Sequence, residues 1–470
     1  MNDENPVFRF DYKALFGVMI VSLPLSVKLF FPLVHTEVIF PGEIFIGLLS
    51  IIFCYQLVIN RAPALCNRTF YFHPITWLIL LYLMVNACAT IFSTMIGVSA
   101  KSLIVKTSYV ITFYGFGYVL CKSSFKSFYP MVKLYGFSMA LVVIYTSLNF
   151  FLADLNLNCI SYLSNPFFSD HTIYAAAISF LLPAFIGFSL FPRLFSSNRI
   201  KWLIVAIVSM ILLAGFCFSY SRAAWVSMAG SLVLCLLIIS GVRFYGFIAI
   251  LMLLVSLTAF KWQDIIRIFE NNKMDSNAFN AGFKEKVFSV TNITTDVSNA
   301  ERINRWSCAL RMAGDKPILG FGPGTFQFQY LPYQKKDEMT YISVTSADQT
   351  GRTTFTWTPG KGLTTPGGAQ VSQGSGGSAH SEYLLALSET GIAGGVIFIA
   401  LALFTLRSGI RSFNLAPTRE QKVVALMILL GLTTYFIHGI FNNFLDDAKL
   451  AFLFWTLLGA LVTLDTKLQG

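Results

Sequence analysis

Arginine and histidine residues gather in three short motifs between residues 219 and 395. Arg222 lies in SYSRAAW, Arg302 and Arg305 lie in ERINRWSCAL, and His380 lies in SAHSEYLLALSETGIAGG. Arg302, Arg305 and Trp306 have the three- and four-residue spacings that place side chains near one face of a helix. These residues are the candidates for chemistry.

Their chemical types suit the transfer of a group from a phosphate. Guanidinium groups bind two phosphate oxygens at once and stay charged at physiological pH. A histidine with a pKa near neutrality can take the proton of a hydroxyl group. Arginines that stabilise a phosphate leaving group and a histidine that activates an acceptor could therefore move a group off a lipid phosphate. No Asp/Glu cluster resembles a DxD metal site beside these motifs, so we expect neither a metal nor another cofactor.

Each candidate also has a purely structural interpretation. Arg222 could be an interfacial arginine whose charged end reaches the lipid headgroups. Arg302 and Arg305 could belong to a solvated helix face, and His380 could be a helix cap or a loop residue. The catalytic interpretation depends on all of them meeting at one site.

Two other histidines lie near the same predicted surface. His171 follows Asp170 in FFSDHTIYAAA, where Asp170 is expected to cap the next helix. His438, in YFIHGIFNNFLDD, is expected to face other helices. Both are alternatives to His380 as a base.

The composition indicates that these motifs are positioned by membrane helices. The chain is 55% hydrophobic and only 12% charged, with a mean hydropathy of +0.65, whereas soluble domains carry about 25% charged residues. The net charge of +11 comes from Lys and Arg in short loops, which form no basic domain and exclude nucleic acid as a partner. We expect an all-α polytopic membrane protein.

Apolar stretches of about 20 residues predict about twelve spans. They lie near residues 14–34, 38–58, 75–95, 102–121, 131–152, 172–191, 201–219, 222–240, 243–260, 382–405, 422–441 and 447–465. The chain therefore divides into 1–260 with nine spans, a large loop domain at 261–381, and 382–470 with three spans. Within the loop domain, residues 283–315 are expected to be helical and residues 333–379 flexible.

The loops alternate in positive charge, and Lys and Arg accumulate on the cytoplasmic side of a membrane. If the N-terminus is cytoplasmic, the basic loops all lie inside, whereas loop 153–171 on the other side has no Lys or Arg. We expect both termini in the cytoplasm. The loop domain and the three motifs then lie on the outer side, which in a bacterium is the periplasm.

The motifs resemble those of the O-antigen ligase and O-antigen polymerase superfamily of bacterial inner-membrane glycosyltransferases. Besides SYSRAAW, the resemblance rests on Arg-x3-Trp followed by Pro-x2-Gly-x-Gly-x-Gly at residues 317–324, and on the His-Ser motif with Gly391 and Gly394. It covers roughly residues 165–400. The loop 333–379 is longer than the family leads us to expect.

The resemblance implies transfer of a glycan from undecaprenyl diphosphate to an acceptor hydroxyl at the periplasmic face, without metal or nucleotide. The family's essential arginines match Arg222 and Arg302, with Arg305 as a further basic residue for the diphosphate, and its catalytic histidine matches His380. The acceptor expected first is lipid A–core, as for a ligase involved in lipopolysaccharide biosynthesis. A growing glycan (polymerase) or a protein hydroxyl (oligosaccharyltransferase) are alternatives.

A transporter or lipid flippase is the rival from another class. Such proteins place ionisable residues near the middle of the membrane. Lys28 and Lys106 fall inside the predicted spans 14–34 and 102–121 and are the main support for this rival. An outer cavity open to lipid would favour the enzyme.

Overall fold

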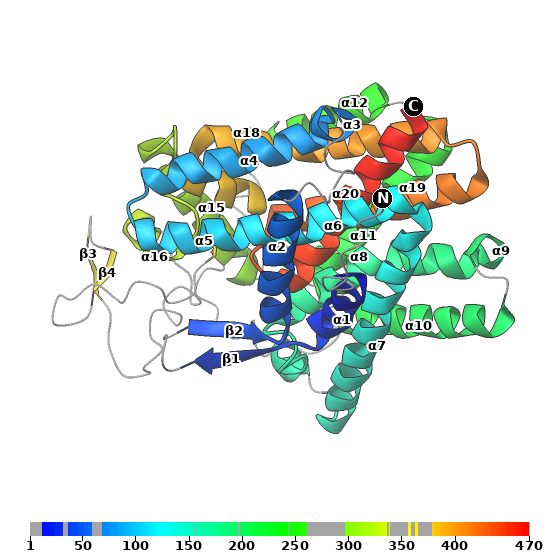
Figure 1. Cartoon of the computed structure of the whole chain (residues 1–470). Helices are drawn as coiled ribbons and strands as arrows, with labels where there is room; N and C mark the ends of the chain where they lie inside the picture. Colours follow the sequence, from blue (N-terminus) through cyan, green and yellow to red (C-terminus); the bar gives the residue numbers. More distant parts are fainter. Residues whose placement is uncertain are drawn as a thin grey trace.

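The computed structural model describes residues 12–31, 36–58, 68–155, 157–195, 198–242, 244–260, 297–335, 338, 356–358, 362–364 and 378–469. In these ranges, nine helices are long and apolar enough to cross a membrane. They are α4 (Pro74–Ile91), α5 (Ile96–Tyr109) continuing through Val110–Gly115 into α6 (Phe116–Ser123), α7 (Phe128–Leu152), α8 (His171–Leu190), α10 (Arg199–Phe218), α11 (Arg222–Ile239), α18 (Glu382–Leu415), α19 (Arg419–Phe441) and α20 (Ala448–Gln469) (Figure 1). The expectation of an all-helical polytopic membrane protein is confirmed.

Other elements complete the described structure. The apolar helices α1 (Tyr12–Leu25), α2 (Gly42–Val58) and α12 (Phe244–Phe260) are shorter, so the count of twelve spans stays a prediction. Short helices are α3 (Arg68–Tyr71), η2 (Phe125–Ser127), η3 (Leu157–Tyr162) and α9 (Pro192–Phe195). In the segment 261–381, the structure describes α15 (Val297–Asp315), α16 (Phe326–Gln329), η6 (Leu331–Tyr333) and the antiparallel pair β3 (Thr356–Thr358) and β4 (Gly362–Thr364). Residues 283–296 of the predicted polar helix, and most of the predicted flexible loop 333–379, lie outside the described residues.

The first predicted span, 14–34, is wrong in its second half. Helix α1 ends at Leu25, directly after Pro24, and the chain then forms an antiparallel hairpin of β1 (Val27–Phe31) and β2 (Thr36–Phe40). The strands are rich in β-branched and aromatic residues, which favour extended backbone. Lys28 is consequently an exposed residue of β1 rather than a charge inside a membrane helix.

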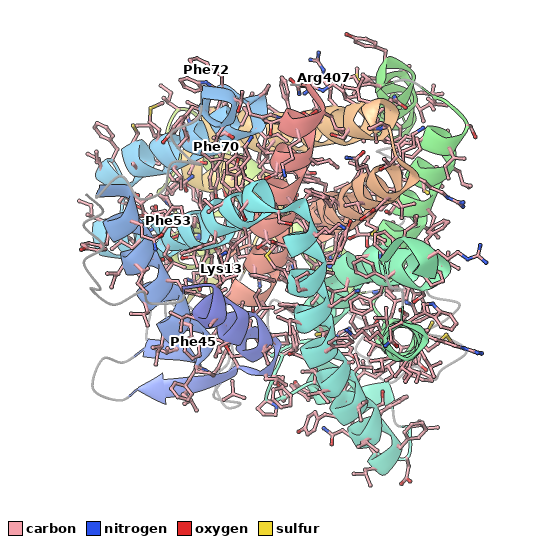
Figure 2. The ribbon with its side chains drawn as sticks, turned by 45° about the vertical axis from the view of Figure 1, so that its right-hand side comes forward. Lys13, Phe45, Phe53, Phe70, Phe72 and Arg407 are labelled. Carbon is pink, nitrogen blue, oxygen red and sulfur yellow. The ribbon has the colours of Figure 1, made fainter. Side chains whose placement is uncertain are left out.

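Helix α20 occupies the centre of the bundle. Every residue from Ala448 to Asp465 is buried, and the helix packs against α5–α6, α8, α18 and α19; Figure 1 shows it in red, running through the middle of the molecule. Aromatic side chains fill the layer around this core. Phe53 of α2 contacts Phe116 with ring centroids 4.7 Å apart, and Phe70 of α3 contacts Tyr118 at 4.2 Å (Figure 2).

The ends of the helices that sequence assigns to the cytoplasm meet at one end of the bundle. Arg411 and His73 both bond to Asp465, and Tyr129 Oη donates to Glu420 Oε1 at 2.6 Å. Helices α15 and α16 lie at the opposite end (Figure 1). These contacts agree with the grouping that loop charge predicts for these helix ends, and the side of the membrane on which each end lies stays a prediction.

Helix α18 is two helices that fold back on each other at Gly391. This glycine has φ +71° and ψ −170°, outside the helical region. A Cβ on Gly395 would lie 3.6 Å from Leu387 Cα, and the rings of Tyr383 and Phe398 are 5.1 Å apart. Residues 382–390 therefore form a short arm against residues 392–415, and the predicted span 382–405 contains this reversal.

Candidate active site

The Arg-x3-Trp motif lies on α15 and connects two membrane helices. Arg302 Nε donates to the backbone oxygen of Phe441 at the end of α19 (3.3 Å), and Trp306 Nε1 donates to the backbone oxygen of His380 (3.1 Å). The four-residue spacing puts both side chains on one face of α15. A guanidinium at the C-terminal end of a helix also offsets the partial negative charge there. The motif therefore fixes His380 relative to α19.

His380 lies just before the short arm of α18. Its backbone is in the left-handed region, with φ +49°, and its side chain is half-buried. The next residue, Ser381, caps the arm by accepting a hydrogen bond from Leu384 N (3.4 Å). His380 is thus held at the start of a helix, in a backbone conformation that is uncommon for a non-glycine residue.

Burial and the charges of Arg302 and Arg305 lower the pKa of His380 to about 3, although a hydrogen bond with Asn442 opposes this shift. Both causes disfavour the protonated ring. The imidazole is therefore neutral at physiological pH, which is the state that can accept a proton. The hydrogen bonds of Arg302 and Trp306 place α15 beside His380, within reach of these charges.

Sequence reasoning missed Asn442, which follows the last residue of α19. Asn442 is buried, and its Nδ2 lies 3.1 Å from His438 Nε2. It also makes a side-chain hydrogen bond with His380. His438 is buried among the helices, as expected. An Asn at a helix end is ordinarily interpreted as a cap, so no signal in the sequence distinguishes this one.

Arg305 is buried and has a carboxylate partner. Its Nε lies 2.7 Å from Glu301 Oε1, and its guanidinium lies over the ring of Tyr330, 4.4 Å from the centroid. Glu301 is four residues before it on α15, a spacing at which opposite charges meet on a helix. The arginine side chain thereby joins α15 to Tyr330, which follows the glycine motif at residues 317–324.

Arg222 is the first residue of α11, after Tyr220 with φ +49° and Ser221. Helix α11 packs against α19, where Ser231 Oγ donates to Leu430 O at 3.0 Å. Near the middle of α11, a Cβ on Gly230 would lie 2.5 Å from Ile437 Cδ1, whereas further along Ile238 clusters with Leu429 and Leu430. Helices α11 and α19 therefore run in opposite directions. The start of α11 therefore lies at the same end of the bundle as the end of α19, where Arg302 binds.

The glycine motif at residues 317–324 pairs with the reversal in α18. Gly322 N donates to Glu389 O, and Ile392 N donates to Pro317 O, both at 2.8 Å. In an uninterrupted helix these groups would bond within the helix. The glycine motif replaces the bonds that the reversal at Gly391 breaks.

Side chains would not fit at this junction. A Cβ on Gly320 would lie 2.4 Å from the carbonyl carbon of Glu389, and a Cβ on Gly391 would lie 2.2 Å from Ile318 O. Both glycines also have positive φ. The glycines of the two separate motifs are needed for the same contact.

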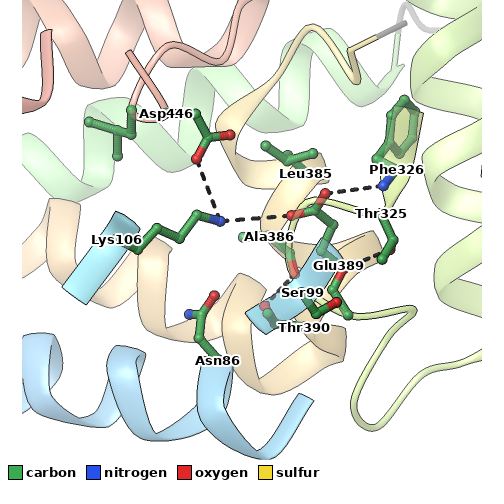
Figure 3. Close-up of polar contacts among 12 residues, drawn as sticks. Asn86, Ser99, Lys106, Thr325, Phe326, Leu385, Ala386, Glu389, Thr390 and Asp446 are labelled. Carbon is green, nitrogen blue, oxygen red and sulfur yellow. Dashed lines mark hydrogen bonds and ion pairs between the residues drawn. The ribbon is translucent and has the colours of Figure 1, made fainter. Parts of the chain in front are cut away.

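A charged cluster lies beside the reversal (Figure 3). Lys106 Nζ of α5 is 3.8 Å from Glu389 Oε2 and 3.7 Å from Asp446 Oδ1. Glu389 Oε1 also accepts a hydrogen bond from Phe326 N (3.1 Å). A small cavity beside Lys106 and Glu389, lined also by Asn86, has room for about one water molecule. Lys106 therefore has two carboxylate partners next to the candidate site, whereas Lys28 is exposed on β1 and is no longer a charge inside a helix.

His171 has the structural surroundings that the sequence predicts. Asp170 caps α8 by accepting a hydrogen bond from Thr172 N at 2.5 Å. His171 Nδ1 lies 3.4 Å from Asp170 Oδ1. The described residues contain no group of three or more His, Cys, Asp and Glu that could hold a metal ion.

These features define a class: a polytopic helical membrane protein with an arginine–histidine site at one end of its bundle. Residues 206–346 match the family model described as O-antigen ligase, which confirms the resemblance to the O-antigen ligase superfamily and supports a glycosyltransferase of the ligase or polymerase type. The matched segment contains Arg222, Arg302 and Arg305 and ends before His380. No curated protein matches the chain.

Proposed function

We propose that the protein transfers a glycan from undecaprenyl diphosphate to a hydroxyl of lipid A–core, with inversion at the anomeric carbon and without a metal. The observation that carries this proposal is the meeting of Arg302 and His380 at the end of α19. The guanidinium of Arg302 is suited to binding phosphate oxygens, and the imidazole of His380 is suited to taking the proton of a hydroxyl group. The family match over the arginine motifs supports the same class of reaction.

In the proposed reaction, the donor diphosphate binds Arg222 and Arg302. The acceptor oxygen attacks the anomeric carbon from the face opposite the diphosphate and forms the new glycosidic bond. The bond from that carbon to the diphosphate oxygen breaks, and the electron pair leaves with the diphosphate, whose growing charge the arginines stabilise. His380 takes the acceptor's proton. Arg305, whose charge is matched by Glu301, holds this arrangement in place rather than gripping the donor.

Binding of the donor would strengthen His380 as a base. In the free site, the charges of the neighbouring arginines lower the pKa of His380. A bound diphosphate offsets those charges, so the pKa of the ring rises when the substrate is present. The base is thereby neutral before binding and more basic at the moment of transfer.

We place the site in the periplasm and both termini in the cytoplasm of the bacterial inner membrane. The alternation of Lys and Arg between loops supports this orientation. The donor's polyprenyl tail would lie in lipid between the helices.

Deletion of the gene, followed by gels of glycolipids and glycoproteins, tests the proposal. Loss of capped lipopolysaccharide is expected, and plasmid-borne wild type should restore it. His380→Ala should not restore it, because loss of a general base costs roughly 10²- to 10⁴-fold in rate. Loss of long chains only, or of glycoprotein, would instead identify a polymerase or an oligosaccharyltransferase. Unchanged glycans, or full activity of a well-folded His380→Ala protein, would refute the proposed role.

A further inference from the structure

Asn442 lies between two histidines that come from different parts of the chain. Its side chain bonds with His380 at the start of α18, and its Nδ2 is 3.1 Å from His438 Nε2 on α19. Asn442 and His438 are both buried. A side-chain amide that contacts two imidazoles has little freedom to turn, because each of its ends already has a partner.

The hydrogen-bond donors and acceptors of His438, Asn442 and His380 can be assigned consistently along the three side chains. An amide has a donating nitrogen and an accepting oxygen. If Nδ2 of Asn442 donates to His438 Nε2, its Oδ1 is left to accept an N–H from the ring of His380. One ring nitrogen of His380 then carries the proton, and the other presents its lone pair. That free lone pair is what a general base needs.

We propose that Asn442 is a positioning residue that fixes the tautomer and the ring orientation of His380, and that His438 fixes the orientation of the Asn442 amide. This inference rests on the proposed function, because it assigns His380 the role of base. It gives His438 an indirect role in place of the alternative role as a base.

The neutrality of the amide is central to this role. A carboxylate at position 442 would favour the protonated ring, whereas the site requires a neutral imidazole that becomes more basic only when the diphosphate binds. The buried amide orients the ring without adding a charge. An asparagine has the same orienting role beside the histidine of papain-like proteases.

The other charged and titratable groups around His380 come from three helices. Helix α15 contributes Arg302 and Arg305, whose charges disfavour protonation. His438 faces the site from α19 through Asn442. On the histidine's own side, Glu382 begins the short arm of α18, and its carboxylate accepts backbone hydrogen bonds from the loop after α19.

The test compares purified variants with the wild type, using a polyprenyl diphosphate-linked glycan and lipid A–core in vesicles. Asn442→Leu should lower kcat by about 10- to 100-fold, a smaller loss than removal of the base itself, with KM for the donor unchanged. Asn442→Asp should move the acid limb of the pH profile upward by about 1–3 units. A purely structural residue would not produce that shift.

Two variants of His438 test the second half of the proposal. Gln can present an accepting oxygen near the position of Nε2, so His438→Gln should keep kcat near that of the wild type. His438→Leu should lose activity to the same degree as Asn442→Leu. Asn443→Leu is the matched control, because Asn443 is the next residue and its Oδ1 has no hydrogen-bond partner among the described residues; its kcat should not change.

The outcomes separate this inference from the proposed function. If the wild type transfers no glycan to any acceptor, the proposed function fails and the inference fails with it. If the wild type is active, then folded Asn442→Leu with normal kcat, or Asn442→Asp with an unchanged pH profile, would overturn the inference alone. Equal losses in His438→Gln and His438→Leu would overturn the role given to His438.

Discussion

His380 is held by contacts from two helices other than its own. Trp306 on α15 binds its backbone oxygen, and Asn442 at the end of α19 binds its ring. These contacts keep the residue at φ +49°, a conformation that costs a non-glycine residue roughly 1–2 kcal/mol. A base held in this way is oriented before substrate binds, so the reaction loses little to rearrangement.

The pH dependence should reflect the lowered pKa of His380. The neutral ring is the active form, and its fraction falls only as pH falls toward the pKa of about 3. We expect kcat/KM to be flat between about pH 5 and 8, unlike that of a base with the ordinary histidine pKa of about 6.5. The acid limb of kcat should lie at higher pH than that of kcat/KM, because kcat reports the donor complex. A kcat/KM that is half-maximal near pH 6.5 would contradict the charge environment described for this site.

The proposed contacts of Arg222 and Arg302 with the diphosphate can be tested by replacing each arginine with lysine. Lysine keeps the charge but has a single ammonium in place of a planar fork. Arg222→Lys and Arg302→Lys should each lose at least about tenfold in kcat/KM for the donor. Arg199→Lys, an exposed arginine at the start of α10, is the control and should be unaffected. Near-normal activity in both site variants would leave only a general electrostatic role for these arginines.

At the scale of elements, the reversal of α18 at Gly391 brings this helix into contact with residues 317–324, which are distant in the sequence. Hydropathy predicts one straight span at 382–405, because apolar character is the same in a straight helix and in two helices that fold together. The reversal depends on the backbone of Gly391 and on the loop at residues 317–324 that pairs with it. Family motifs identified these glycines in advance, but not their contact with each other. The hairpin after α1 was missed for the same reason, since its strands are as apolar as a helix.

Gly391→Ala should destabilise the protein strongly. Positive φ alone costs an alanine roughly 1–2 kcal/mol, and its Cβ would lie 2.2 Å from Ile318 O. We expect a clear drop in the midpoint of thermal unfolding in detergent. Gly97→Ala on α5 is the matched control, because a Cβ there meets nothing within 4 Å, and alanine favours a helix by about 1 kcal/mol. Equal stability of Gly391→Ala and the wild type would contradict the reversal.

At the scale of the molecule, the sequence predicts the two-ended organisation and much of the candidate site. The Arg-x3-Trp motif meets the His-Ser motif where Trp306 binds the backbone oxygen of His380, and the charges of Arg302 and Arg305 reach the His380 ring. Asn442 and the partners of Lys106 could not be predicted, because only the packed bundle brings His380 beside Asn442 and brings Glu389 and Asp446 beside Lys106.

Reporter fusions test the orientation that loop charge predicts. A reporter active only in the periplasm should be active when fused after residue 340 and silent when fused after residue 415. The expected pattern follows from the Lys and Arg of the loops around α18 and α19. The reverse pattern would put the arginine–histidine site on the cytoplasmic side and would remove the basis for a periplasmic acceptor.

The burial of α20 has a consequence for how the protein is made. Ribosomes synthesise the chain from its N-terminus, so α5–α6, α8, α18 and α19 enter the membrane before the helix that they surround. Until α20 arrives, these helices lack their central partner, and the backbone oxygen of Ser26 lacks the Lys449 Nζ that bonds to it in the folded protein (2.8 Å). Before α20 is inserted, the central position that it occupies among these helices is therefore unfilled. We therefore expect a chain truncated before α20 to lose the packing of the helices that surround it.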